Sequence, residues 1–291
     1  MAETLRELVS EELSAPVDRR VTALAEAIAA KHGKASRAVL FYGSCLRQKQ
    51  LEGLMLDFYL VVSDYRSAYP KAWLAAANRL IPPNVFYFEK DGLAAKYAVM
   101  SEKDFERECG PDARSTSIVA RFAQPSRLVW SANKGAVNRV IDAVSQCAPT
   151  LLGWTVSLVP DNVETLDFWK RAFQLTFGAE LRAERTDRSS SIVDANPDRY
   201  RRFGEAMQMP VSYPGDSGAR WWKRMQRKGK RLSVLRLAKA SFTFAGGADY
   251  IAWKINRHAG TRIELKPWQR RWPLLAGISL LPRLIRSGAV R

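Results

Sequence analysis

The chain of 291 residues is 47% hydrophobic and 26% charged, which is typical of a folded protein and excludes an intrinsically disordered one. This length suffices for one large domain or two smaller ones. Three scattered cysteines without a Cys-x-x-Cys pair favour a reducing compartment and argue against a disulfide framework or a zinc site, and two distant histidines argue against a metal cluster.

The N-terminal part mixes helices and strands. Helices are expected where apolar residues recur every three or four positions: residues 3–14, 18–32, 46–50 and 67–80. Strands are expected over apolar and aromatic runs bounded by turn residues: 38–42, 55–63, 85–88 and 96–100. A turn at Asp91-Gly92 joins the last two strands. These elements predict an α+β fold with a mixed sheet and flanking helices.

From about residue 129 the chain becomes helical. Helices are expected over 133–147, 163–177 and 197–208, with a polar loop over 187–197 and a linker over 213–218. We therefore expect three parts: an α+β domain over 1–128, a helical accessory domain over 129–215 and a basic C-terminal segment over 216–291.

The net charge of +17 is concentrated in this last segment. Residues 217–291 contain 18 basic and two acidic residues, a balance of +16, which leaves +1 for the first 216 residues. Such a segment favours an anionic partner, either nucleic acid or a membrane surface rich in acidic lipid.

The end of the chain has the pattern of an amphipathic tail. Helices are expected over 232–244 and 250–258, and the last 25 residues place Trp, Leu and Ile at helical steps among arginines. The apolar stretch 272–281 is too short to span a bilayer, so it favours an interfacial helix. The predicted membrane contacts are Trp268, Arg270, Arg271, Trp272, Arg283 and Arg286. Two alternatives are a core helix with solvated arginines, and stacking of Trp and Arg on nucleic-acid bases.

The most informative motif is a strand that runs into a Gly43-Ser44 turn, followed at Asp57 by a second strand. Backbone N–H groups of such a turn can bind phosphates, and glycine allows their close approach. A carboxylate facing the turn could hold Mg²⁺ against those phosphates. This is the layout of a nucleotidyltransferase active site. The alternative is an ordinary turn and an aspartate at the edge of a strand.

Taken together, these motifs resemble the mitochondrial translocator-maintenance type of phosphatidate cytidylyltransferase, the peripheral CDP-diacylglycerol synthase, in a bacterial-like version. The similarity is best over residues 38–147. Six segments of this chain resemble motifs of the family. They are Tyr-Gly-Ser at 42–44, the glutamine at 48, Asp-Phe at 57–58, Lys-Tyr at 96–97, the Arg and Pro within 120–125, and the Asn-containing helix at 133. Cys45 replaces a family glycine, and a histidine-containing insertion of the family is missing.

The resemblance implies transfer of a cytidylyl group from CTP to phosphatidate, giving CDP-diacylglycerol and pyrophosphate in phospholipid biosynthesis. It implies a nucleotidyltransferase fold, a magnesium cofactor and a peripheral location at the cytoplasmic face of an anionic membrane, with no stable nucleic-acid partner. The expected catalytic residues are Asp57 and Lys96, and the expected nucleotide-binding residues are Gly43, Ser44, Gln48, Arg121 and Asn133. The expected metal ligands are Asp57 and Glu89, with Asp91 as the competitor of Glu89.

Three alternatives remain open. The chain could be a nucleotidyltransferase that acts on RNA or a soluble acceptor, with the basic segment binding nucleic acid. It could be a catalytically inactive lipid-binding protein of the same fold. It could also be a basic interaction module with a coincidental Gly-Ser turn, in which Lys96, Arg121 and Glu89 are ordinary surface charges.

Overall fold

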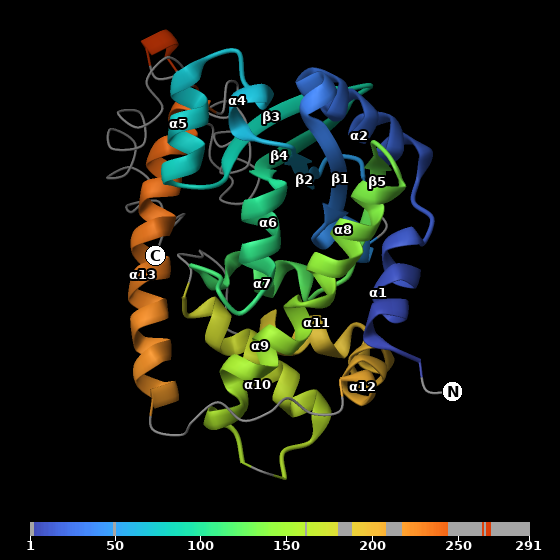
Figure 1. The fold of residues 1–291 in the computed structure, drawn as a ribbon, viewed down its shortest axis with the longest axis vertical. Helices are drawn as coiled ribbons and strands as arrows, with labels where there is room; N and C mark the ends of the chain where they lie inside the picture. The colour runs from blue at the N-terminus through green and yellow to red at the C-terminus, as the bar shows by residue number, and fades with distance from the viewer. Residues whose placement is uncertain are drawn as a thin grey trace.

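The computed structural model describes residues 3–48, 51–160, 162–179, 188–207, 217–243, 264 and 266–268. A five-stranded sheet lies at one end of the molecule, and helices cover both of its faces and extend beyond one end of it (Figure 1). The strand order is β3-β4-β2-β1-β5. Their bounds are β1 Ser36–Tyr42, β2 Met55–Val62, β3 Asn84–Lys90, β4 Leu93–Ser101 and β5 Ser126–Ser131.

The sheet is mixed. β2 and β4 run parallel, whereas the pairs β1–β2, β1–β5 and β3–β4 are antiparallel. Asp91 and Gly92 form the turn between β3 and β4, both with positive φ, of 52° and 74°. Such a two-residue turn matches the twist of the strands it joins. The prediction of an α+β fold with a mixed sheet and flanking helices is therefore confirmed.

Successive side chains of each strand point to opposite faces of the sheet, and each face packs into an apolar core of its own. On β2, Leu56, Phe58 and Leu60 face one core, and Tyr59 and Val61 face the other. The first core is covered by α2 Arg19–His32, α3 Ser44–Gln48, α4 Tyr65–Ala68 and α5 Ala72–Leu80. The second is covered by α1 Leu5–Ser14, α6 Glu102–Cys109, α7 Thr116–Phe122 and α8 Lys134–Ser145. Asp57 lies two positions before Tyr59 on the strand and therefore belongs to the second face.

The second core continues without a break into the helices that follow the sheet. These are α9 Cys147–Thr155, α10 Thr165–Phe177, α11 Arg188–Asp194 and α12 Pro197–Ala206, with short 3₁₀ turns at Gly33–Ala35 and Val156–Leu158. Trp169 of α10 is fully buried in this core and donates a hydrogen bond to Tyr200 O at 3.1 Å. The sheet and these helices therefore share one apolar core. The domain boundary expected between residues 128 and 129 falls inside β5.

Several elements differ from the sequence-based expectation. The helix expected over 67–80 is two helices, α4 and α5, because Pro70 disfavours helical backbone at the residue before it. The loop expected over 187–197 contains α11, whose Ile192 and Val193 are buried. That burial outweighs the weak helix propensity of its serines. β5, α6, α7 and α9 were not anticipated.

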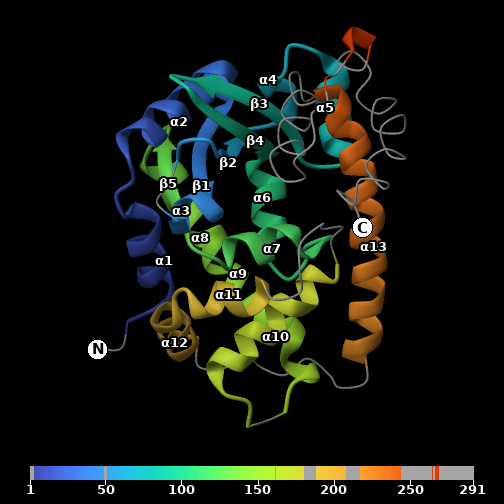
Figure 2. The ribbon, with the colours of Figure 1, turned by 180° about the vertical axis from the view of Figure 1, so that it is seen from behind.

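The basic segment contains one long helix, α13 Ser217–Thr243, where a linker and a shorter helix were expected. It runs along one side of the molecule, past α5, in both views (Figures 1 and 2). Buried Trp222 attaches its first half through an Nε1–H hydrogen bond to Trp154 O at 2.7 Å. Lys and Arg are good helix formers, which explains why this charged sequence continues as a helix.

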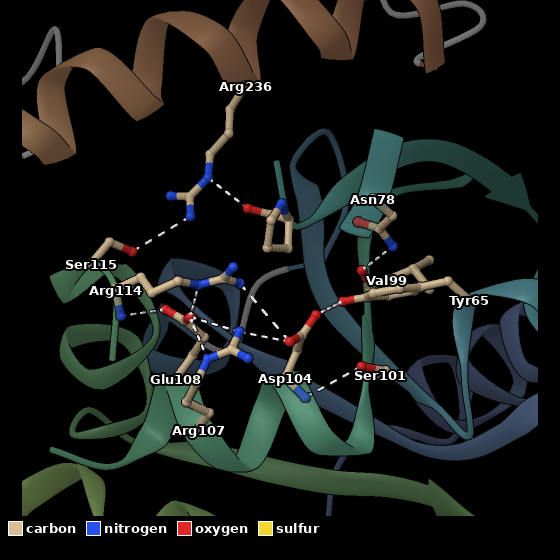
Figure 3. Close-up of polar contacts among 11 residues, drawn as sticks. Tyr65, Asn78, Val99, Ser101, Asp104, Arg107, Glu108, Arg114, Ser115 and Arg236 are labelled. Carbon is tan, nitrogen blue, oxygen red and sulfur yellow. Dashed lines mark hydrogen bonds and ion pairs between the residues drawn. The ribbon is translucent and has the colours of Figure 1, made fainter. Parts of the chain in front are cut away.

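A polar cluster fixes α6, the start of α7 and the second half of α13 (Figure 3). The buried Glu108 accepts hydrogen bonds from Arg114 Nε at 2.7 Å and Arg107 Nη2 at 3.1 Å. Arg236 of α13 donates to Pro82 O at 2.8 Å and to Ser115 Oγ at 3.4 Å. These contacts orient α13 so that its other side faces solvent.

Much of the predicted membrane tail lies outside the described residues. This holds for Arg270, Arg271, Trp272, Arg283 and Arg286, and also for the helix expected over 250–258. Trp268 is described, and its side chain is 44% exposed. Among the helices that the structure describes, none combines the length and the apolar composition of a membrane span.

Candidate functional site

The candidate site lies where β1 ends and β2 begins. Asp57 of β2 pairs with Tyr42 of β1 on one side and with Lys96 of β4 on the other. Directly opposed residues of neighbouring strands point to the same face of a sheet. Tyr42, Asp57 and Lys96 therefore form a row across three strands, next to the turn at Gly43.

Gly43 and Asp57 approach each other closely. Gly43 has a φ of 94°, a conformation that side chains other than glycine's rarely adopt. A β carbon on Gly43 would lie 2.9 Å from Asp57 Oδ2, closer than such atoms can come. The turn and the carboxylate thus share one small space, as the sequence predicted they would, and only glycine fits at the turn.

Lys96 and Asp57 form an ion pair. Lys96 Nζ lies 3.0 Å from Asp57 Oδ1, and the lysine side chain is 44% exposed whereas that of Asp57 is 18% exposed. Oδ1 itself is buried and accepts no hydrogen bond from the described residues, so the 3.0 Å contact is electrostatic and poorly aligned for a hydrogen bond. The hydrogen-bonding capacity of Asp57 Oδ1 is therefore unused within the described residues.

Arg121 lies on the same face of the sheet as Asp57. Its guanidinium lies 5.2 Å from the centre of the Tyr42 ring and 5.7 Å from that of Tyr59. Its Nη1 donates to Tyr59 OH at 3.4 Å and to Ser117 O at 3.3 Å. Stacking on these aromatic rings positions the Arg121 guanidinium on this face of the sheet.

Ser44 and Cys45 follow the turn. Ser44 is partly buried at the start of α3, and the side chain of Gln48 lies outside the described residues. Cys45 is buried, and its thiol donates to Met55 O at 3.5 Å. Burial, and to a lesser degree the charge of Asp57, raises the pKa of the Cys45 thiol. Cys45 is therefore a packed, neutral side chain behind the turn.

The structure does not bring Glu89, Asp91 or Asn133 to this row. Glu89 is exposed on β3 and accepts a hydrogen bond from Tyr87 OH at 2.6 Å. β4 separates β3 from β2, which places Glu89 at least two strand spacings, roughly 10 Å, from Asp57. Asp91 lies in the exposed turn beyond Glu89.

Asn133 has a structural role at the opposite end of β1. Tyr42, next to Gly43, pairs with Ser126, whereas Ala38 pairs with Ser131, two residues before Asn133. The Asn133 side chain accepts a hydrogen bond from Ala136 N at 2.9 Å and thereby caps α8. This geometry separates Asn133 from the Gly43 turn by the length of a strand.

Asp57 is the carboxylate that could hold a metal ion here. Within the described ranges, no group of three or more His, Cys, Asp or Glu side chains is arranged to bind a metal. Mg²⁺ in nucleotide sites is commonly bound by only one or two carboxylates, with phosphates and water as the other ligands. A single carboxylate at the Gly43 turn, that of Asp57, corresponds to that minimal arrangement.

Two tyrosines of the site were missed by the sequence analysis. Tyr42 and Tyr59 hold Arg121 beside the row, and their rings lie 5.5 Å apart. The signal was present, because Tyr59 lies two positions after Asp57 on the same strand and must face the same way.

No protein-family model matches the chain, and no curated protein shows significant similarity to its sequence. Among solved structures, the chain is similar to a nucleotidyltransferase-like protein from Exiguobacterium sibiricum. The identity is 10%, 92% of each chain is covered, and the TM-score is 0.30. Similarity at this level carries no conclusion about activity, which has to be inferred from the site itself.

Proposed function

We propose that this protein is a nucleotidyltransferase that transfers a cytidylyl group from CTP to phosphatidate at an anionic membrane surface. The observation that carries the proposal is the close approach of the Gly43 turn to the Asp57 carboxylate. A glycine turn that leads into a helix, beside a single carboxylate, suits a magnesium-bound triphosphate. CTP and phosphatidate come from the family resemblance.

Each residue of the row has a part in this chemistry. The Gly43 turn would bind the triphosphate, and Asp57 would hold Mg²⁺, which when bound supplies charge neutralisation at the phosphates. Lys96, half exposed and 3.0 Å from Asp57, can reach a phosphate that enters beside the carboxylate. Arg121 adds a second positive charge from α7. Positioning and neutralisation of this kind account for most of the catalysis in phosphoryl-type transfers.

A general base is not needed for this reaction. The attacking group of phosphatidate is already a phosphate anion, and it displaces pyrophosphate from the α-phosphate of CTP. His32, the one histidine that the structure describes, is used elsewhere: its Nδ1 lies 2.9 Å from Ala68 O and its Nε2 3.3 Å from Tyr97 OH.

The exposed side of α13 supports a membrane partner. α13 contains no acidic residue, and its buried side is marked by Trp222, Met225 and Gly229. The opposite side, which we call the basic face, carries four arginines at helical steps: Arg220, Arg224, Arg227 and Arg231. Val234 and Leu235, 54% and 48% exposed, lie at one end of it. Basic residues beside exposed apolar ones suit the surface of an acidic bilayer.

Transfer of label from CTP to phosphatidate tests the proposal. Full-length protein is incubated with Mg²⁺, radiolabelled CTP and vesicles with or without phosphatidate, and labelled lipid is extracted. We expect phosphatidate-dependent labelling in the wild type and at least about a hundredfold loss in Asp57→Asn. Asp112→Asn is the matched control, because Asp112 is exposed and distant in sequence from the site.

The other outcomes separate the alternatives. Full activity of Asp57→Asn would exclude the assigned site. Labelling of RNA or of a soluble acceptor, without labelling of lipid, would keep nucleotidyl transfer and reject phosphatidate. Vesicle binding without any transfer would identify a catalytically inactive lipid-binding protein.

A further inference from the structure

A second polar site lies at the outer edge of the sheet, beside β5. A cleft of about 260 Å³ opens between α1, α12 and the segment that leads into β5. Leu8, Pro125 and Phe203 form apolar parts of its wall. Its charged side chains are three arginines and two glutamates: Arg127, Arg199, Arg202, Glu11 and Glu12. We refer to it as the Arg127 cleft.

Both glutamates of the Arg127 cleft are already paired. Arg199 binds Glu12 with two hydrogen bonds, from Nε to Oε2 and from Nη2 to Oε1, the latter 2.9 Å long. The Arg199 guanidinium also stacks on Phe203, 4.0 Å from its ring centre. Glu11 accepts a hydrogen bond from Arg202 at 3.1 Å. Neither carboxylate is left over to neutralise Arg127.

Among the residues that the structure describes, Arg127 has no counter-charge of its own. Its Nη1 donates to the neighbouring Ser126 O at 2.9 Å, and its buried Nε makes no hydrogen bond within the described part of the chain. Burial lowers the pKa of Arg127, and the charge of Glu12 opposes this effect only in part. Arg127 is only partly exposed, and a guanidinium shielded from water in this way is costly without an anion. Its position in an open cleft points to a ligand that supplies the anion.

We propose that the Arg127 cleft binds the phosphate monoester of a ligand, with Arg127 as its main contact. The Nη1–H and Nη2–H groups at the end of a guanidinium form a fork that matches two oxygens of a phosphate. Asn196 lines the same cleft and forms no side-chain cap on α12, so its amide can donate to a third oxygen. The apolar wall suits the organic part of such a ligand.

This site is separate from the Gly43–Asp57 row. Ser126, next to Arg127, pairs with Tyr42, and Tyr42 pairs with Asp57. The strands of Arg127 and Asp57 therefore lie two spacings apart, roughly 10 Å. Binding at the Arg127 cleft can thus be measured whether or not the protein transfers nucleotides.

Calorimetric titration of the full-length protein tests the cleft. One arm uses inorganic phosphate, and the other uses a short-chain phosphatidate below its micelle concentration, which separates a free phosphate from a lipid headgroup. We expect Arg127→Gln to weaken binding at least roughly tenfold, the value of a lost charge-assisted pair of hydrogen bonds. Arg127→Lys keeps the positive charge without the fork, so its affinity should lie between those of the wild type and Arg127→Gln.

One control makes the result specific. Arg201→Gln removes an exposed arginine of α12 that pairs with Asp198 and does not line the cleft, and it should bind as the wild type does. A loss in Arg127→Gln for both ligands supports the cleft as a general phosphate site, and a loss for the lipid alone supports a headgroup site. Equal affinities of the wild type and both Arg127 variants would overturn the proposal.

Discussion

A β carbon on Gly43 would lie 2.9 Å from the Oδ2 atom of Asp57. The two residues are separated by a short helix and a loop in the sequence, yet they meet because β1 and β2 are neighbours and Tyr42 pairs with Asp57. The Gly43 turn and the Asp57 carboxylate are therefore in direct contact in the folded protein. Any group larger than a hydrogen atom at position 43 displaces one of them.

Gly43→Ala is expected to abolish nucleotide transfer. The substitution strains a backbone with a φ of 94° and pushes the new methyl group into the Asp57 carboxylate. Gly92→Ala is the matched control, since Gly92 also has a positive φ, of 74°, but open space around its β position. Both variants should lose about 1–2 kcal/mol of unfolding free energy from backbone strain. Only Gly43→Ala should lose activity in addition, and equal activity of the two variants would contradict the proposed site.

Lys96→Met is expected to impair activity much more than stability. The Lys96–Asp57 ion pair is partly exposed, so its loss should cost less than about 1 kcal/mol of unfolding free energy. If Lys96 contacts a phosphate in the transition state, kcat should fall about a hundredfold. Lys90→Met, on the exposed end of β3, should leave both quantities unchanged. Wild-type kcat in Lys96→Met would restrict Lys96 to balancing the charge of Asp57.

His32 is expected to make stability depend on pH. Burial, which outweighs the hydrogen bond to Ala68 O, lowers the pKa of His32 below its ordinary 6.5. Below pH 6.5 the unfolded chain therefore binds a proton that the folded chain does not, and stability falls as pH decreases toward the folded pKa. His32→Asn keeps a donor near Ala68 O but does not titrate.

Denaturant unfolding between pH 7.5 and pH 5 checks this expectation. The free energy of unfolding should fall more steeply for the wild type than for His32→Asn, so that the difference between them shrinks as pH decreases. Parallel curves would show that His32 does not change its protonation on unfolding in this range.

The local patterns of this chain predicted the elements that border the site. The strand before Gly43, the strand headed by Asp57 and the Asp91-Gly92 turn each have a signal within a few residues, in alternation or in turn chemistry. α11 and β5 have no such signal. Their short, serine-containing sequences are fixed by burial of Ile192, Val193 and Val129 in cores assembled from distant residues.

The composition of the site was harder to predict than its position. Register between strands places Lys96 beside Asp57 and Glu89 two strands away, and register depends on pairing that a single sequence does not specify. Asn133 illustrates the same limit. Its place before a helix is equally consistent with a binding residue and with the N-cap that it forms.

The basic face of α13 yields a last prediction, on membrane binding. Replacement of Arg220, Arg224, Arg227 and Arg231 by Gln should weaken binding to phosphatidate-containing vesicles several hundredfold at low salt, at about 1 kcal/mol for each charge. The matched control replaces four exposed bases away from α13, on or next to α2 and α8: Arg19, Lys31, Lys34 and Lys134. Both variants lose the same net charge, so only the position of the charges differs. Vesicle co-sedimentation at rising ionic strength measures the effect, because screening by salt should weaken vesicle binding most in the wild type. Equal binding of the two variants would mean that overall charge, and not the orientation of α13, brings the protein to the membrane.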